Sequence, residues 1–158
     1  MNGLHVHRVE RLWLTIGISM LVLFLIIITA AALVDGVVPP SNVQSIDPTR
    51  VAETPPFDKP GLRKIGPNEY EAYYVAHIFA FTPQHVIVPL GAHVTFYVTS
   101  EDVEHGFTIP ETSINTMVTP GWVSTVSYTF RKAGKFLLLC NEYCGIDHHA
   151  MFSDVEVR

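Results

Sequence analysis

One long run of residues without a charged side chain most strongly limits what this protein can be. It spans residues 12–34, with the sequence LWLTIGISMLVLFLIIITAAALV. At about 1.5 Å per helical residue this run reaches roughly 35 Å, which is enough to cross the hydrocarbon core of a bilayer. Its polar side chains, Thr15, Ser19 and Thr29, can each bond to the backbone of their own helix. The sequence therefore predicts a transmembrane helix over residues 12–34.

A cleaved signal peptide is the alternative interpretation of this run, because the alanines at 30–32 resemble a cleavage site. The run is longer than the roughly 7–15 residues of a typical signal core, which favours a retained anchor. Arg8 and Arg11 precede the run, and the first charge after it is Asp35. By the positive-inside rule, residues 1–11 lie in the cytoplasm and the chain after residue 35 lies outside. We therefore expect a single-pass protein of the cell membrane with its larger part on the periplasmic side.

Proline is concentrated directly after the apolar run. More than half of the 11 prolines lie in this short stretch: Pro39, Pro40, Pro48, Pro55, Pro56 and Pro60. Because proline lacks a backbone donor, we expect residues 35–68 to form an extended tether instead of a helix or a sheet strand.

The remaining part of the chain, residues 69–158, has the pattern of a β domain. Short runs rich in β-branched and aromatic residues alternate with turn residues at 73–81, 85–89, 93–100, 106–109, 115–118, 123–130, 135–140 and 152–157. About eight strands in about 90 residues predict a mainly β fold, a β-sandwich or small barrel of Greek-key type. The net charge of −5 and the lack of a basic run argue against nucleic-acid binding.

Side chains that bind soft metals gather in the loop between the last two predicted strands. Cys140, Cys144, His148 and Met151 fall in this loop, and His105 lies at the end of an earlier strand. Sulfur and imidazole ligands suit copper or zinc. One Cys, two His and a Met form a blue-copper ligand set, and a second Cys would allow two bridging thiolates to hold two copper ions. A disulfide is the alternative use of the cysteines outside the cytoplasm, but the neighbouring His and Met favour copper.

These residues form a motif that resembles the binuclear copper A site of cytochrome c oxidase subunit 2. The motif reads His105…Cys140-x-Glu142-x-Cys144-x-x-x-His148-x-x-Met151. The order of the chain also resembles this family, with one N-terminal anchor, a tether and a β domain. The resemblance implies a Greek-key cupredoxin-like domain over residues 69–158. The short length and single span resemble the ba3-type (B-type) branch of the haem–copper oxidases.

The resemblance also implies a role for each position of the motif. Cys140 and Cys144 would be the bridging thiolates, and His105 and Met151 would complete the ligands of one copper. The second copper would be completed by the two remaining positions, the side chain of His148 and the backbone carbonyl of Glu142. Whether magnesium binds near position 142 stays open.

Several residues near the motif have no ligand role in this interpretation. His149, next to a ligand, is expected at the surface. Asp102 and Glu104 either orient the imidazole of the nearby upstream ligand or belong to a solvated acidic turn. Phe107 and Phe152 are expected to keep water away from the metals.

The resemblance implies that the chain is the electron-entry subunit of a terminal oxidase. It would accept electrons from cytochrome c and pass them to haem in subunit 1, where oxygen is reduced. The implied partners are subunit 1 and cytochrome c. A further small subunit is also compatible with the resemblance. The acidic excess of the chain favours a basic donor.

Three other functions fit the sequence less well. A membrane-anchored copper chaperone or thiol reductase would carry its histidine far downstream of the cysteines. A nitrous-oxide-reductase copper A module would need a large catalytic domain. A quinol-oxidising relative of subunit 2 would lack the two cysteines.

Overall fold

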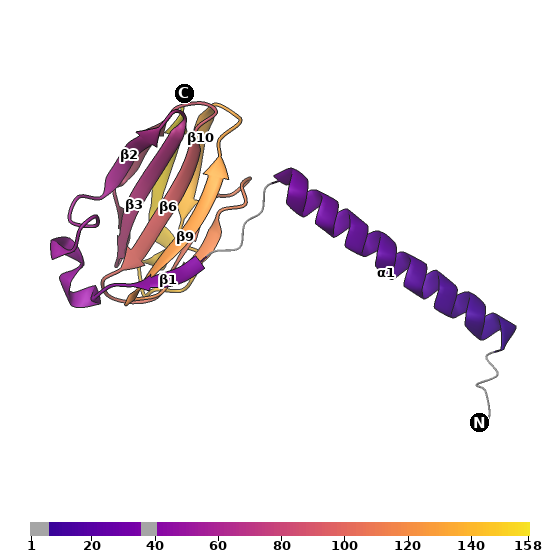
Figure 1. The fold of residues 1–158 in the computed structure, drawn as a ribbon. Helices are drawn as coiled ribbons and strands as arrows, with labels where there is room; N and C mark the ends of the chain where they lie inside the picture. The colour runs from indigo at the N-terminus through magenta and orange to yellow at the C-terminus, as the bar shows by residue number, and fades with distance from the viewer. Residues whose placement is uncertain (1–6, 36–40) are drawn as a thin grey trace. The chain divides into compact units, whose positions relative to one another are not determined.

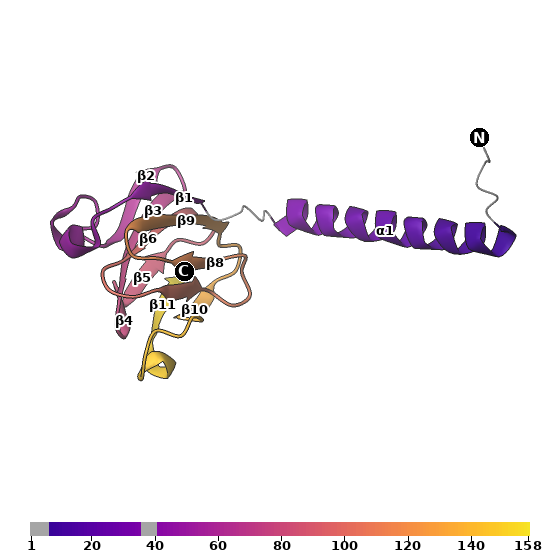
Figure 2. The same cartoon turned by 90° about the horizontal axis from the view of Figure 1, so that it is seen from below.

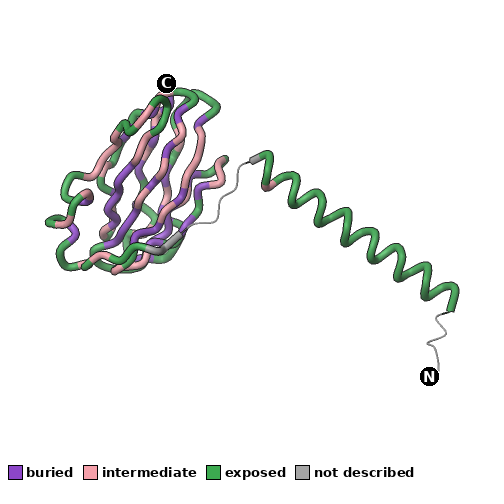
Figure 3. The backbone as a smooth tube through the Cα atoms, in the orientation of Figure 1, coloured by how far each residue is buried: buried purple, intermediate pink, exposed green. Residues whose placement is uncertain are grey.

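The computed structural model describes residues 7–35 and 41–158, and it divides them into two separate units (Figure 1). The first unit contains the helix α1 (Arg8–Asp35), which includes the whole predicted span. Its mean hydropathy is 2.8 over a membrane-length window, and its apolar side chains are exposed (Figure 3). Thr15 Oγ1 donates a hydrogen bond to Arg11 O at 2.8 Å, so this polar side chain is satisfied within the helix. The length and composition of α1 fit a membrane span.

The second unit is a sandwich of two sheets, which Figure 2 shows as separate layers. Sheet A has the order β1 (Ser41–Ser45), β9 (Trp122–Thr129), β6 (His93–Ser100), β3 (Glu69–His77) and β2 (Gly61–Gly66), with β4 (Ala80–Thr82) also paired to β3. Sheet B has the order β5 (His85–Val88), β11 (Phe152–Val157), β10 (Gly134–Leu139), β7 (His105–Thr108) and β8 (Asn115–Val118). Two short 3₁₀ helices complete the elements, η1 (Pro48–Glu53) and η2 (His148–Ala150). The predicted mainly β sandwich is confirmed.

The core lies between the two sheets, where alternate residues of the strands face inward (Figure 3). Phe107 of sheet B is its centre: its ring lies 5.3 Å from Tyr74, 5.7 Å from Phe81 and 5.7 Å from Phe96, measured between ring centroids. All four side chains are fully buried. These aromatic contacts fix the sheets against each other and hold the strand ends in place.

The segment predicted as a tether over 35–68 differs from that expectation. Residues 36–40, with two of its prolines, lie outside the described residues, but β1 and β2 belong to sheet A and η1 lies between them. Val51 and Phe57 are buried against Tyr73, on the face of sheet A away from the main core. The described prolines are compatible with this because they lie outside β1 and β2: Pro48 stands at the start of η1, and Pro55, Pro56 and Pro60 lie between η1 and β2.

Most predicted strands agree with the structure, and the exception lies near the candidate site. The strands at 93–100, 115–118 and 152–157 are confirmed at both ends. The run at 73–81, predicted as one strand, is divided into β3 and β4, which pair in an antiparallel hairpin. The chain reverses at Ile78 and Phe79, where Ile78 N donates a hydrogen bond to Asp102 Oδ2 at 2.6 Å.

Candidate metal centre

Sheet B brings the candidate ligands to one end of the sandwich. β10 pairs with β11, and its last residue, Leu139, lies opposite Thr108, the last residue of β7. Because β7 and β10 are antiparallel, the start of β7 lies beside the residues that follow β10. The loop from Cys140 to Met151 is closed at its base, where Cys140 N donates to Met151 O at 3.2 Å. His105 is the first residue of β7, and the backbone N of Gly106 lies 3.4 Å from Cys140 Sγ. Strand pairing therefore places one distant histidine against the cysteine loop.

A close approach of two backbones explains why position 106 is a glycine. A Cβ atom on Gly106 would lie 2.8 Å from the backbone N of Asn141 and 1.9 Å from its Oδ1. No side chain fits at these distances, so only glycine allows β7 to lie this close to the loop. The sequence does not indicate this constraint, since a lone glycine in a strand gives little information about what approaches it.

The two cysteine sulfurs lie near each other without a bond between them. Cys140 Sγ and Cys144 Sγ are 3.8 Å apart, whereas bonded sulfurs are separated by about 2.05 Å. The alternative interpretation of the two cysteines as a disulfide is therefore wrong for this structure. Nδ1 of His105 lies 3.9 Å from Cys140 Sγ, and the potential ligand atoms of these three buried residues are all within 4.8 Å of one another.

Three further donors of the motif face the same pair of sulfurs. His148 Nδ1 lies 3.4 Å from Cys144 Sγ, and Met151 Sδ lies 3.7 Å from the same sulfur. The backbone carbonyl of Glu142 lies 3.2 Å from Cys140 Sγ, while the side chain of this residue is exposed. The structure thus brings together all six positions of the motif, and each sulfur has its own imidazole.

Asp102 determines which nitrogen of His105 faces the cysteines. His105 Nε2 lies 2.9 Å from Asp102 Oδ1, so Nε2 carries the proton and Nδ1 presents its lone pair to Cys140. Burial lowers the pKa of His105, but the neighbouring Cys140 and Asp102, whose negative charges favour the imidazolium, outweigh burial and hold the pKa above its ordinary value. Glu104 instead accepts a hydrogen bond from Thr119 Oγ1 at 3.0 Å. Of the two acids considered from the sequence, Asp102 is the one in contact with the imidazole.

The surroundings favour ionisation of one thiol before the other. Burial raises the pKa of Cys140, but the neighbouring His105 imidazole and the hydrogen bond from the amide of Gly106 outweigh burial and lower the pKa below that of an ordinary thiol. Burial raises the pKa of Cys144, and the negative charge of a Cys140 thiolate raises it further. Cys140 is therefore the first thiolate of the metal-free chain, and a bound cation would favour loss of the second proton.

The chemistry of the donor set fits copper. Two thiols, two imidazole Nδ1 atoms, a thioether and a carbonyl oxygen all direct electron pairs toward one small region. Hydrogen bonds alone satisfy such a set poorly, because it holds more acceptors than protons. A soft cation satisfies it well, since thiolate, thioether and imidazole are ligands that copper prefers.

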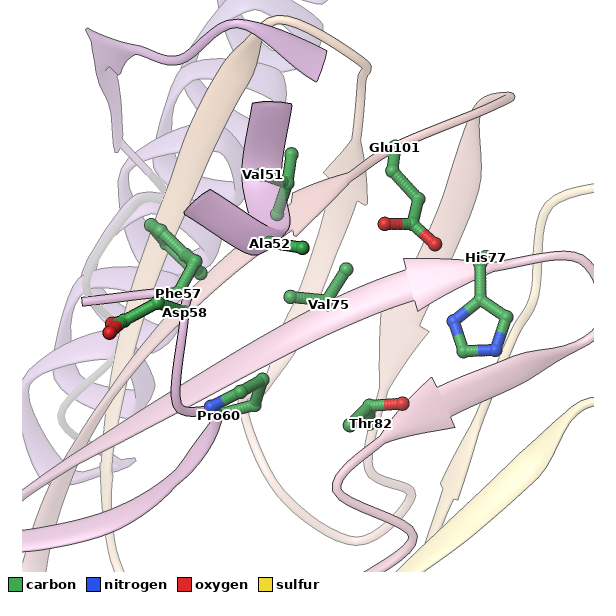
Figure 4. Close-up of a pocket in the computed structure, with 9 residues that line it drawn as sticks. All are labelled: Val51, Ala52, Phe57, Asp58, Pro60, Val75, His77, Thr82 and Glu101. Carbon is green, nitrogen blue, oxygen red and sulfur yellow. The ribbon is translucent and has the colours of Figure 1, made fainter. Parts of the chain in front are cut away.

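Other residues considered from the sequence lie apart from these donors or differ from expectation. His149 is exposed, as predicted for a residue beside a ligand. Phe107 is fully buried, but Phe152 is 55% exposed and so does not shield the site as predicted. A separate pocket, with a volume of about 180 Å³, lies between the η1 segment and sheet A, with His77 and Glu101 on one side and Phe57 on the other (Figure 4). None of the six donors lines this pocket.

Comparison with known proteins agrees with this geometry. The family model described as "Cytochrome C oxidase subunit II, periplasmic domain" matches residues 74–157. A cytochrome c oxidase subunit 2 of Thermus thermophilus is 40% identical over 153 residues, covering 94% of this chain and 91% of the relative. Another Thermus thermophilus sequence of the same name is 41% identical over 132 residues, covering 82% and 98%.

Solved structures give the same result. A chain of a haem–copper terminal oxidase dimer, determined by cryo-electron microscopy, superposes with a TM-score of 0.78 at 30% identity, covering 96% of this chain and 100% of that one. The periplasmic domain of oxidase subunit II from Bradyrhizobium japonicum has a TM-score of 0.52 at 20% identity and covers 56% and 83%, which supports the cupredoxin-like fold alone. The chain belongs to the cytochrome c oxidase subunit 2 family and is a subunit of a haem–copper terminal oxidase.

Proposed function

We propose that this subunit holds a binuclear copper A centre and is the point where electrons enter the oxidase. The observation that carries the proposal is the pair of unbonded sulfurs, 3.8 Å apart, with a separate imidazole facing each one. A single four-coordinate ion, as in a zinc site, would use four of these donors and leave the thioether and the carbonyl without a role. Two bridged copper ions use all six.

In this proposal each residue has one task. Cys140 and Cys144 would bridge the two ions, and His105 and Met151 would complete the ligands of one of them. The other ion is completed by the two remaining donors, His148 Nδ1 and the carbonyl of Glu142.

The bound copper pair would supply a one-electron redox centre. The chain contributes a rigid and dry setting for that centre. Cys140 and Cys144 are 7% and 9% exposed, and His105 and Met151 are buried. The hydrogen bond from Cys140 N to Met151 O joins the two ends of the loop, and Gly106 N of β7 donates to Cys140 Sγ. Little motion of the ligands is therefore available when the charge of the centre changes.

The loop that carries the ligands also offers a surface for partners. Tyr143 and Ile146 are 80% and 84% exposed, and the acidic side chain of Glu142 is exposed as well. We propose cytochrome c as the electron donor and haem in subunit 1 as the acceptor, with α1 packed against subunit 1. The N-terminus would lie in the cytoplasm and the sandwich on the periplasmic side. The single span favours a ba3-type oxidase. A further small subunit of the complex is compatible with this proposal.

The copper content of the purified full-length chain in detergent tests the proposal. We expect two copper ions for each chain, together with an electron paramagnetic resonance pattern of one electron shared equally by two copper nuclei. The physical reason is that two bridging thiolates couple the ions closely enough to delocalise the electron. One copper for each chain, or the spectrum of a single localised copper, contradicts the proposal.

A substitution of Met151 by leucine tests whether the thioether is a weak ligand, in contrast to the bridging thiolates. Leucine has a similar volume, so the buried site is expected to lose less than about 1.5 kcal/mol of stability. The copper pair remains, and its reduction potential rises, because an electron-pair donor to the oxidised state is lost. Voltammetry of the copper-loaded chain measures this change.

Met117→Leu is the matched control for this measurement. Met117 is 47% exposed on β8 and is not one of the six donors of the motif. Its replacement is expected to leave the potential unchanged. Complete loss of copper from Met151→Leu, or an equal shift in both variants, shows that the thioether does not act as a weak ligand.

A further inference from the structure

The carboxylate of Asp102 connects two parts of the metal end of the sandwich. Its Oδ1 accepts hydrogen bonds from His105 Nε2 at 2.9 Å and from the backbone N of Val103 at 2.6 Å. Its Oδ2 accepts a hydrogen bond from the backbone N of Ile78 at 2.6 Å. Both oxygens of this side chain are therefore used, and each one binds a different segment of the chain.

The first of these links acts on the imidazole. His105 is fully buried, so water does not replace Asp102 as the acceptor for its Nε2 proton. A neutral imidazole has one protonated nitrogen, and the bond to Asp102 fixes that nitrogen as Nε2. The lone pair of Nδ1 then faces Cys140, which is the direction that a metal ligand needs.

The second link acts on the turn between β3 and β4. This turn consists of Ile78 and Phe79, which stand between the two paired strands of the hairpin. The ring of Phe79 packs on the main core and against Gly145: a Cβ atom on Gly145 would lie 2.9 Å from Phe79 Cε1. Gly145 directly follows Cys144, so the turn held by Asp102 also supports the cysteine loop.

We propose that Asp102 is a positioning residue for the metal centre, which joins the orientation of His105 to the position of the Ile78–Phe79 turn. This inference rests on the proposed copper function. Ile78 is 49% exposed, so a partner that contacts it is separated from His105 by one carboxylate and two hydrogen bonds.

The orientation of the imidazole can be tested without any substitution. In the metal-free full-length chain in detergent, at a pH at which the imidazole is neutral, the ¹⁵N chemical shifts of His105 are expected to show its single proton on Nε2. A proton on Nδ1 overturns the proposal. This measurement needs no copper, so it distinguishes a failure of this inference from a failure of the proposed copper function.

The substitution Asp102→Asn tests the connection between the two segments. The amide oxygen is expected to keep the position of Oδ1, where it retains the bonds to His105 and Val103. The amide nitrogen then faces the Ile78 N–H, and two donors cannot bond. The Ile78 amide is expected to exchange with deuterium about tenfold faster or more, because a hydrogen bond to a charged acceptor is lost. In the copper-loaded chain the reduction potential should rise, since a neutral acceptor makes His105 a weaker electron donor.

Glu104→Gln is the matched control, because it removes one negative charge two positions away without touching the imidazole. Glu104 binds Thr119 Oγ1 instead of the turn. We expect its Ile78 exchange and its potential to equal those of the unmodified chain. If Asp102→Asn and Glu104→Gln behave alike in both measurements, the effect is general electrostatics and the proposal is wrong.

Discussion

Replacement of Cys144 by serine is expected to abolish the spectrum of the delocalised copper pair. Cys144 Sγ lies 3.8 Å from the other sulfur and faces both His148 and Met151, so it contacts three other members of the set. A serine hydroxyl is a harder ligand with a far higher pKa and does not bridge two copper ions. Since loss of a residue that only supports a metal ligand costs about 10–100-fold in affinity or activity, loss of a bridging ligand should cost more than about 100-fold.

The measurement is the electron paramagnetic resonance spectrum and the rate of electron uptake from a reduced cytochrome c, both on the full-length chain in detergent. The adjacent pair His148 and His149 supplies the control. His148→Ala removes a donor at 3.4 Å from Cys144 Sγ and should also destroy the pattern, whereas His149→Ala changes an exposed side chain and should preserve it. A delocalised spectrum in Cys144→Ser, or its loss in His149→Ala, contradicts the proposed assignment.

Replacement of Phe107 by alanine is expected to have the largest effect on stability. The ring is fully buried and has three aromatic neighbours at centroid distances of 5.3 to 5.7 Å. Removal of a buried phenylalanine side chain typically costs ~3–5 kcal/mol of unfolding free energy, because the transfer energy is lost and a cavity remains. Denaturant unfolding of the metal-free chain in detergent measures this change.

Phe152→Ala is the control for the stability measurement. Phe152 also lies in sheet B but is 55% exposed, so its loss removes little buried surface and should cost less than about 1 kcal/mol. Similar costs for the two variants would mean that the core is not centred on Phe107.

The candidate donors could be identified from the sequence because most of them are close together in it. Cys140, Cys144, His148 and Met151 occupy one loop, and a spacing of three or four residues in such a loop brings side chains into contact whatever the rest of the fold does. Their chemistry is specific, since few arrangements of two thiols, an imidazole and a thioether serve a purpose other than soft-metal binding. The structure adds the fact that both thiols are free.

The tether prediction was wrong for a physical reason. Proline indicates only the loss of a backbone donor at its own position, and the described prolines before β2 lie in η1 or between η1 and β2, where no strand pairing needs that donor. What holds β1, η1 and β2 on the sandwich is the burial of Val51 and Phe57 against Tyr73. These contacts join residues that are far apart in the chain, so no local sequence pattern in a proline-rich segment predicts them.

The amino-acid sequence by itself determined the apolar helix, the β character of the larger unit and the ligand loop, because each depends on residues that are neighbours in the chain. The tertiary structure alone decided how Gly106 lets β7 approach Asn141, which acid binds His105, and how Asp102 reaches Ile78. Such contacts depend on the pairing of strands and the paths of loops between them. They are set by the packing of the whole sandwich, and their energy appears only after the sheets have formed.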